Sequence, residues 1–286
     1  MYKTKVKNEG FEGILFPGNG QKEKILIVMS GSNGGMNLTK QCAKFYNDNG
    51  IPALALALFG TKGTQPFLDR VPIEYVENAI NWLKKQGYKK IGIDGMSKGS
   101  EIALISASMF PENISRVIVR VPSYFVSEGL IKRRKSKGPS GTSCWSYKGR
   151  EIPYAPYKTR NFNILKMFKE EKELHLIDFN KDKEIIPESI INISKIKAPI
   201  LMLSSKKDSV WPSYDSAVYM NNKLKETNFS YPYKHIAYEN ISHALLTKIP
   251  YLYKIFFKTE RENPIECKED RDNLKKDLLE WVNNVW

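Results

Sequence analysis

The chain has 286 residues, of which 41% are hydrophobic, so it can bury a sizeable core and is neither disordered nor fibrous. Its N-terminus is polar, and the most apolar segment, residues 51–59, is too short to cross a bilayer, so we expect a cytoplasmic protein without a membrane span. The net charge of +14 favours anionic partners, namely nucleic acid, membrane surfaces or phosphorylated small molecules. Because the lysines are spread along the chain, a generally lysine-rich composition explains this charge equally well.

Short apolar runs that are typical of strands alternate with amphipathic stretches that are typical of helices. This alternation predicts βαβ units and an α/β fold, with a mostly parallel sheet covered by helices on both faces. The strand-like runs cover residues 13–16, 25–30, 52–58, 91–94, 116–121, 199–204 and 233–238. The helical patterns cover residues 37–47, 73–86, 98–109, 213–225 and 271–285.

The alternation is interrupted between residues 127 and 197. This segment is basic and polar, is rich in Gly, Pro and Ser in part, and shows no clear strand rhythm. Long insertions between two strands are often lids or substrate-binding elements. We therefore predict a single domain, residues 1–286, with an inserted cap-like segment at residues 127–197.

The sequence offers little to hold a metal or a nucleotide. Its three cysteines, Cys42, Cys144 and Cys267, are far apart and show no CxxC or Cys/His spacing, which predicts reduced thiols and no metal site. The motifs GxGxxG and GxxxxGK[ST] are both missing, so we expect no nucleotide cofactor. No recognised nucleic-acid-binding fold accompanies the positive charge, so we do not expect a nucleic-acid partner.

The motif GMSKG, residues 95–99, lies where a predicted strand passes directly into a predicted helix. One interpretation is a tight turn in which the glycines relieve crowding and Ser97 caps the helix. The other is a nucleophile elbow, which presents Ser97 on a strained turn at the end of a strand. The β-branched run before the motif and the long helical pattern after it favour the nucleophile.

A serine nucleophile needs a base within hydrogen-bond reach, and the sequence has three histidines. His243 directly follows the last strand-like run, where a catalytic base is expected in an α/β-hydrolase. His175 lies in the insertion, and His235 alternates within a strand-like run, which is more typical of a structural side chain. We therefore predict His243 as the base.

The base needs an acid that orients it, and Asp208 follows a buried strand-like run. The order Ser97, Asp208, His243 is the chain order of α/β-hydrolases. The alternative role for Asp208 is an Asx turn before the helix that follows. Asp178 and Asp182 are weaker candidates because they lie in the insertion.

An oxyanion hole needs two backbone N–H groups directed at the developing negative charge. The N–H of Lys98, directly after the nucleophile, is the first expected donor. The second should come from the glycine-rich loop at residues 31–35, with Ser32 the first choice and Asn33 the second. A phosphate cradle is the alternative for this loop, but the nucleotide-binding motifs are missing.

At this point the chain resembles the acyl-CoA thioesterase and bile acid-CoA:amino acid N-acyltransferase family, in its C-terminal hydrolase domain. The similarity spans nearly the whole chain in the right order, and the Ser-Lys-Gly elbow with the Asp-x-x-Trp turn is its most specific part. The resembling segments are EGILFPG (12–18), SGSNGG (30–35), ALALALFG (53–60), GMSKGSE (95–101), SYKG (146–149), DSVWPS (208–213) and SH (242–243).

The resemblance implies an α/β-hydrolase fold and a Ser-Asp-His hydrolase that cleaves acyl-CoA thioesters through an acyl-enzyme. In the acyltransferase branch the nucleophile is cysteine and the acyl group passes to an amino acid, so Ser97 favours transfer to water. A carboxylesterase of the dienelactone-hydrolase type, an acyl-CoA:amino acid N-acyltransferase and a non-enzymatic binding protein are the alternatives.

The densest basic run begins in the insertion with Lys132, Arg133, Arg134 and Lys135. Its cations could bind the phosphates of CoA through charge-assisted hydrogen bonds. A solvated basic loop is the other interpretation, and the sequence does not choose between them.

Overall fold

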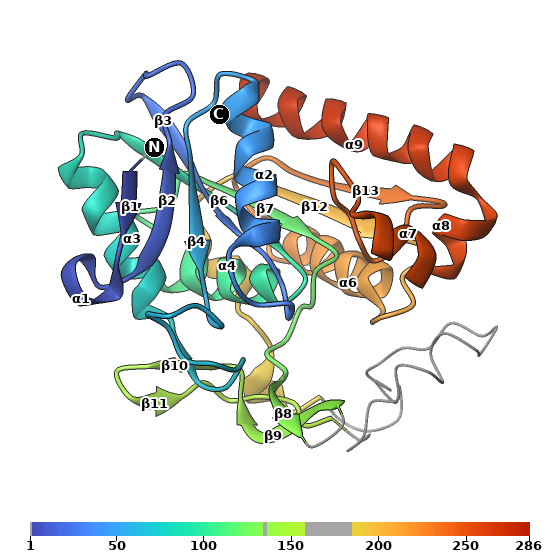
Figure 1. The fold of residues 1–286 in the computed structure, drawn as a ribbon, viewed down its shortest axis with the longest axis horizontal. Coiled ribbons are helices and arrows are strands. Elements are labelled where there is room, and N and C mark those ends of the chain that lie inside the picture. Colours follow the sequence, from blue (N-terminus) through green and yellow to red (C-terminus); the bar gives the residue numbers. More distant parts are fainter. Residues whose placement is uncertain (1, 134–135, 158–184) are drawn as a thin grey trace.

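The computed structural model describes residues 2–133, 136–157 and 185–286. Within these ranges an eight-stranded sheet forms the centre of the molecule (Figure 1). β2 runs antiparallel to β1 and β4, and all other neighbours are parallel. In spatial order the strands are β1 (Tyr2–Thr4), β2 (Glu12–Phe16), β4 (Ala53–Ala57), β3 (Lys24–Met29), β6 (Lys90–Met96), β7 (Arg116–Arg120), β12 (Ile200–Ser205) and β13 (Tyr233–Tyr238).

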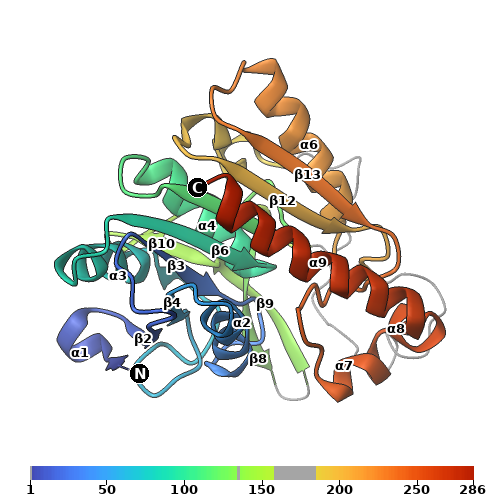
Figure 2. The same cartoon turned by 90° about the horizontal axis from the view of Figure 1, so that it is seen from above.

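Helices cover both faces of this sheet. Buried side chains of α3 (Glu74–Lys85), α4 (Lys98–Met109) and α6 (Ser213–Glu226) share one apolar core. Those of α2 (Asn37–Asp48) and α9 (Pro264–Asn284) share the other, and α9 runs across the sheet in Figure 2. Shorter helices are α1 (Val6–Glu9), α7 (Tyr251–Phe256), α8 (Lys258–Glu262) and the 3₁₀ turns η1 (Pro187–Ser189) and η2 (Ile193–Lys195).

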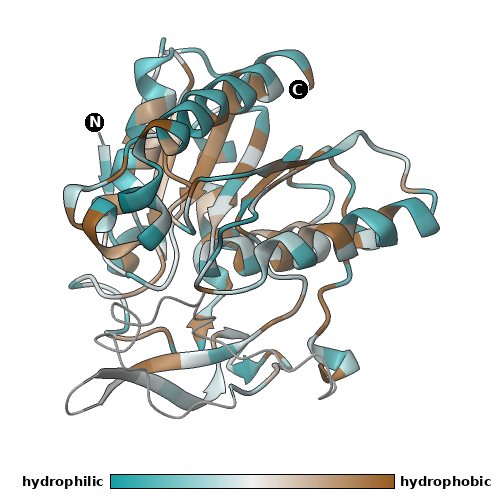
Figure 3. Cartoon of the chain, turned by 90° about the vertical axis from the view of Figure 1, so that its right-hand side faces the viewer, coloured by the Kyte–Doolittle hydropathy of each residue, from teal (hydrophilic) through white to brown (hydrophobic). Residues whose placement is uncertain are grey.

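Successive side chains of the central strands enter opposite cores, as the two-residue period of a strand requires. In β3, Ile25 and Ile27 pack with α3 and α4, whereas Leu26 and Val28 pack with α2 and α9. Both sides are apolar, and the strands are mostly brown in Figure 3 while the helices outside them carry much more teal. A sheet that is buried on both faces explains why its strands read as continuous apolar runs.

The predicted alternation is confirmed. The seven strand-like runs coincide with β2, β3, β4, β6, β7, β12 and β13, and the five helical patterns coincide with α2, α3, α4, α6 and α9. The last helix begins at Pro264, well before the predicted start near residue 271. Its first turns are polar, and proline is well suited to the first position of a helix because its missing N–H would have no partner there.

The inserted segment contains strands that its sequence did not indicate. β8 (Glu128–Arg133) and β9 (Ser136–Ser143) form an antiparallel pair with a register shift between Glu128 and Leu130, which breaks the alternation expected of a regular strand. β10 (Trp145–Tyr147) pairs with β11 (Arg150–Glu151) and with β5 (Val71–Pro72). Figure 1 shows β8–β11 outside the central sheet, on one side of it.

Across the described ranges, no helix combines the length and the apolar character that a membrane crossing needs.

We expect the three cysteines to be unreactive in the folded protein. Cys42, Cys144 and Cys267 are at most 3% exposed, and burial raises the pKa of all three thiols, to about 12 for Cys144 and about 11 for Cys267. The thiolate is the reactive form, so iodoacetamide at about pH 8 should modify them only after unfolding in urea. Mass spectrometry of native and unfolded samples checks this, and rapid alkylation of any cysteine in the native sample would contradict it.

Candidate active site

Ser97 is the single residue between β6 and α4. Its backbone has φ 56° and ψ −123°, a conformation that non-glycine residues avoid, and it costs about 1–3 kcal/mol. The Ser97 N–H donates to the carbonyl of Arg120 on β7 at 2.9 Å, which holds the turn against the next strand. The geometry is that of a nucleophile elbow, in which a serine side chain stands out from the end of the sheet.

The two glycines of the motif allow α4 to approach the sheet closely. A Cβ atom on Gly95 would lie 2.1 Å from the carbonyl oxygen of Gly99, and one on Gly99 would lie 2.6 Å from that of Ser30. Neither position has room for a side chain, because the obstacle in both cases is backbone. The helix can therefore start one residue after the strand ends.

Ser97, His243 and Asp208 form a continuous line of hydrogen bonds. The Oγ of Ser97 lies 2.9 Å from Nε2 of His243, and Nδ1 of His243 lies 2.9 Å from each carboxylate oxygen of Asp208. Asp208 follows β12 and His243 follows β13, so all three residues come from the carboxyl ends of parallel strands. Ser97 is 5% exposed and Asp208 4%, and the His243 side chain is 12% exposed.

The carboxylate of Asp208 is fixed by its own loop as well as by the histidine. Its Oδ1 accepts the N–H groups of Val210 at 2.9 Å and Trp211 at 3.2 Å, so the Asx turn considered above exists alongside the contact to His243. The Trp211 ring meets the His243 ring edge-on, with centroids 5.7 Å apart. Its indole N–H donates to the carbonyl of Val121 at 3.0 Å.

The competing residues lie elsewhere or outside the described ranges. His235 is on β13, its Nε2 lies 2.7 Å from the Ser204 hydroxyl, and burial lowers its pKa. His175, Asp178 and Asp182 lie outside the described residues.

The glycine-rich loop at residues 31–35 lies directly against the candidate nucleophile. A Cβ atom on Gly31 would be 2.7 Å from Cβ and 3.0 Å from Oγ of Ser97. The next residue, Ser32, is half-buried, whereas Asn33 is exposed and its side-chain amide donates to the carbonyl of Gly34. Lys98 is the first residue of α4, where a backbone N–H has no partner within the helix. Gly31 therefore lies against Ser97, with Ser32 directly after it, and Lys98 follows Ser97 in the chain.

The side chain of Lys98 forms a buried ion pair that sequence reasoning missed. Its Nζ lies 3.1 Å from Oε1 of Glu101, and both side chains are at most 2% exposed. Burial opposes the charged form of Lys98, yet Cys144 and Glu101 beside it keep its pKa well above the usual value. The available signal was the spacing of three residues between a cation and an anion just after the elbow.

Glu101 and Lys98 connect α4 to the inserted segment. Glu101 accepts the Ser127 hydroxyl at 2.5 Å and the indole N–H of Trp145 at 3.0 Å. Nζ of Lys98 also contacts the Ser127 hydroxyl and lies 3.0 Å from Sγ of Cys144. The segment that follows β7 is therefore held against the first turn of α4 by buried polar groups.

The basic run falls largely outside what the structure describes. Arg134 and Lys135 are outside the described residues, and the side chains of Lys132 and Arg133 are not described.

The fold is that of an α/β hydrolase. The chain superimposes on a putative dienelactone hydrolase from Klebsiella pneumoniae with a TM-score of 0.58 at 15% identity, covering 99% of this chain and 98% of that one. The corresponding values for Est1E from Butyrivibrio proteoclasticus are 0.52 and 14%, with 99% and 98% coverage. At this identity the likeness confirms the predicted fold.

The family follows from sequence. The profile of the family described as BAAT / Acyl-CoA thioester hydrolase C terminal matches residues 71–261, and the chain belongs to this family. The peroxisomal succinyl-coenzyme A thioesterase of Mus musculus is 28% identical over 204 residues, which cover 70% of this chain and 43% of that protein. Acyl-coenzyme A thioesterase 6 of Mus musculus is 33% identical over 108 residues, 37% of this chain and 25% of that protein. The chain thus matches less than half the length of these relatives.

We expect the folded protein to tolerate the loss of Lys98 alone poorly, because its partner Glu101 is fully buried. Replacing Lys98 with Met leaves Glu101 buried without its cation, so the free energy of unfolding should fall by about 3–5 kcal/mol. The control is Lys223→Met, because Lys223 pairs with Glu226 at the same spacing on the exposed surface of α6. Exposed pairs contribute about 0–1 kcal/mol. Urea unfolding of both variants measures the difference, and equal losses would contradict a structural role for the buried pair.

Proposed function

We propose that this protein is a serine hydrolase that cleaves acyl-CoA thioesters to a free acid and CoA through an acyl-Ser97 intermediate. The observation that carries the proposal is the hydrogen-bonded line from Ser97 through His243 to Asp208, in a member of a thioester hydrolase family. A serine hydroxyl is a weak nucleophile unless a base accepts its proton, and this line supplies both the base and the acid that orients it.

In the first step the Ser97 oxygen attacks the thioester carbonyl while Nε2 of His243 takes the hydroxyl proton. The carbonyl oxygen becomes an oxyanion, which the backbone N–H groups of Lys98 and Ser32 stabilise, with Asn33 as the alternative to Ser32. Asp208 accepts the Nδ1–H of His243, so it fixes the tautomer and stabilises the imidazolium. When the tetrahedral intermediate collapses, the C–S bond breaks and CoA leaves as its thiol, with the proton from His243.

In the second step His243 removes a proton from water, which attacks the acyl-Ser97 ester. The same two N–H groups hold the second oxyanion. Collapse breaks the bond between the acyl carbon and the Ser97 oxygen, and His243 returns its proton to that oxygen. The products are the free acid and the original serine.

We also propose that residues 127–197 form a cap on a single hydrolase domain. Two observations support this. Glu101 and Lys98 bind Ser127 and its neighbours beside the nucleophile, and β10 of the segment pairs with β5, which precedes α3. A cap anchored this close to Ser97 would line the acyl pocket. We further propose that the basic run Lys132–Lys135 of this segment binds the phosphates of CoA, in keeping with the net charge of +14.

A thiol-release assay tests the reaction. Wild-type protein should release CoA from acyl-CoAs, and Ser97→Ala should lower kcat by about 10⁴-fold or more because the covalent route is lost. Ser108→Ala is the matched control, since Ser108 is on the same helix and only donates to the carbonyl of Ile105. p-Nitrophenyl esters are run in parallel. Full turnover by Ser97→Ala would refute the nucleophile, and ester cleavage without thiol release would refute the thioesterase.

Charge reversal tests the CoA contacts. The double variant K132E/R133E should raise KM for acyl-CoA roughly tenfold, because charge-assisted contacts to phosphate would be replaced by repulsion. KM for a p-nitrophenyl ester should stay the same. The control K85E/K90E changes the charge equally at exposed positions, and Lys90 begins β6 at the end of the strand remote from Ser97. Equal effects on the two substrates would indicate a solvated basic loop.

A further inference from the structure

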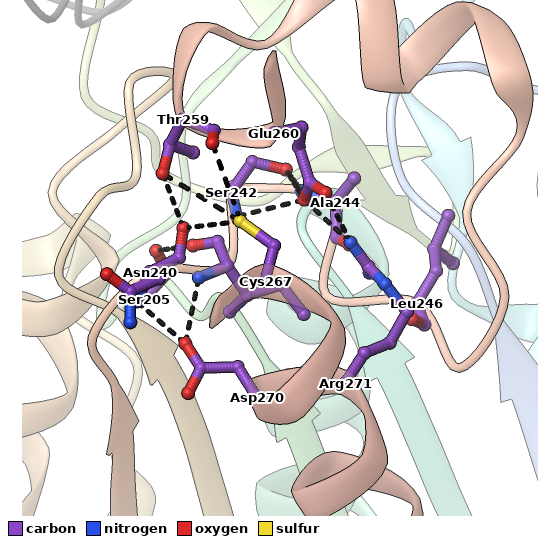
Figure 4. Close-up of polar contacts among 11 residues, drawn as sticks. Ser205, Asn240, Ser242, Ala244, Leu246, Thr259, Glu260, Cys267, Asp270 and Arg271 are labelled. Carbon is purple, nitrogen blue, oxygen red and sulfur yellow. Dashed lines mark hydrogen bonds and ion pairs between the residues drawn. The ribbon is translucent and has the colours of Figure 1, made fainter. Parts of the chain in front are cut away.

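The loop that carries His243 is bound along its backbone by side chains from α8 and α9 (Figure 4). This loop, residues 240–246, follows β13 and forms neither helix nor strand. Buried backbone polar groups need partners, and three charged side chains of α8 and α9 supply several of them. We call Glu260, Asp270 and Arg271 the loop clamp.

Asp270 binds the start of the loop. Its Oδ2 accepts the N–H of Asn240 at 2.7 Å and the N–H of Ile241 at 3.0 Å. The carbonyl of Asn240 accepts the Thr259 hydroxyl at 2.6 Å and the Cys267 thiol at 3.1 Å. The first residue of the loop is therefore fixed through both its donor and its acceptor.

Glu260 binds the residue directly before the histidine. Its Oε1 accepts both the backbone N–H of Ser242, at 3.2 Å, and the Ser242 hydroxyl, at 2.8 Å. The Ser242 hydroxyl oxygen in turn accepts the N–H of Ala244 at 3.2 Å. Glu260 therefore holds Ser242 directly and Ala244 indirectly, through the Ser242 hydroxyl.

Arg271 binds the residues after the histidine and completes the clamp. Its Nη1 donates to the carbonyls of Ala244 at 3.2 Å and Leu246 at 2.9 Å. Its Nη2 lies 2.7 Å and 2.6 Å from the two carboxylate oxygens of Glu260. One guanidinium therefore binds both the loop carbonyls and the Glu260 carboxylate. The two side chains are 8% and 3% exposed. Charged hydrogen bonds between groups this deeply buried are strong and directional.

The opposite side of the loop is bound by the sheet. Arg120 of β7 donates from Nη1 to the carbonyl of Leu245 at 3.3 Å and from Nε to Asp94 of β6 at 2.9 Å. Ser205, at the end of β12, donates to the carbonyl of Ile241 at 2.5 Å and accepts the N–H of Lys207 in the loop of Asp208. The histidine loop is therefore fixed between the sheet and the two C-terminal helices.

We infer that Glu260, Asp270 and Arg271 are positioning residues, which set the His243 ring at hydrogen-bond distance from both Ser97 and Asp208. A buried ion pair adds little net stability compared with apolar side chains of the same volume, so packing alone does not account for this set. Each member binds loop backbone within three residues of His243, and proton transfer is highly sensitive to the position of the base. The inference rests on the proposed role of His243 as the general base.

The test compares aspartates of the same helix in the full-length protein. Asp270→Ala removes one member of the loop clamp, at a half-buried position, and leaves the Glu260–Arg271 pair in place. Asp277→Ala removes a contact of the same kind, from α9 to the Tyr238 hydroxyl at 2.7 Å, that does not bind the loop. Asp272→Ala removes surface pairs with Lys268 and Lys275. Arg271→Lys keeps the charge beside Glu260, but a lysine ammonium cannot reproduce the two separate nitrogen donors, Nη1 and Nη2, of the planar guanidinium.

Two rates are measured on folded samples, with urea unfolding alongside. The first is labelling of Ser97 by a fluorophosphonate probe, which needs His243 but no bound thioester, and the second is kcat with its KM. Asp270→Ala and Arg271→Lys should lower both rates by about 10- to 100-fold with KM unchanged, because a displacement of about 1 Å is that costly. Asp272→Ala and Asp277→Ala should keep wild-type rates, even where Asp277→Ala lowers stability.

The outcomes separate this inference from the proposed function. Wild-type rates in folded Asp270→Ala and Arg271→Lys would overturn the positioning role, and so would equal losses in Asp277→Ala. If the wild-type protein is labelled at Ser97 but releases no thiol, the thioesterase proposal fails while the labelling rates still decide the role of the clamp. A wild-type protein that is not labelled at Ser97 would refute both.

Discussion

The close contact between α4 and the ends of β3 and β6 is the constraint on which the site depends. There is no room for a Cβ atom at Gly95 or Gly99, so the helix follows the strand after one residue and Ser97 takes a strained backbone conformation. The parallel sheet then brings the ends of β12 and β13 to the same edge. The strained backbone is that of the residue whose hydroxyl lies 2.9 Å from the His243 ring, in the loop after β13.

Buried ion pairs surround this edge, and each one connects a loop of the site to a segment distant in sequence. Lys98 and Glu101 bind the inserted segment, Glu260 and Arg271 bind the histidine loop, and Arg120 bridges that loop to Asp94. Such pairs add little to the net free energy of folding. They require a defined geometry, because a buried charge that loses its partner carries a large desolvation penalty. Their arrangement is consistent with a site whose parts must keep fixed distances.

The central strands and the main helices could be predicted because burial on both faces leaves clear apolar runs and helical periods. The abrupt strand-to-helix turn at Ser97 could be predicted because a β-branched run passes directly into a helical pattern there. β8–β11 could not, since the β8–β9 register is irregular and β10 also pairs with β5, far earlier in the chain. The loop clamp gave no signal either, because Glu260, Asp270 and Arg271 lie among many charged residues that resemble an ordinary solvated helix face.

The sequence by itself determined which chemical groups are present, in which order they follow the strands, and which stretches form helices and strands, since these depend on local pattern. Only the tertiary structure decided that His243 meets Ser97 across 146 residues of chain and that α8 and α9 hold its loop. Hydrogen bonds operate over about 3 Å, and no local periodicity encodes distances between segments so far apart. Those distances follow from how the sheet and its helices pack.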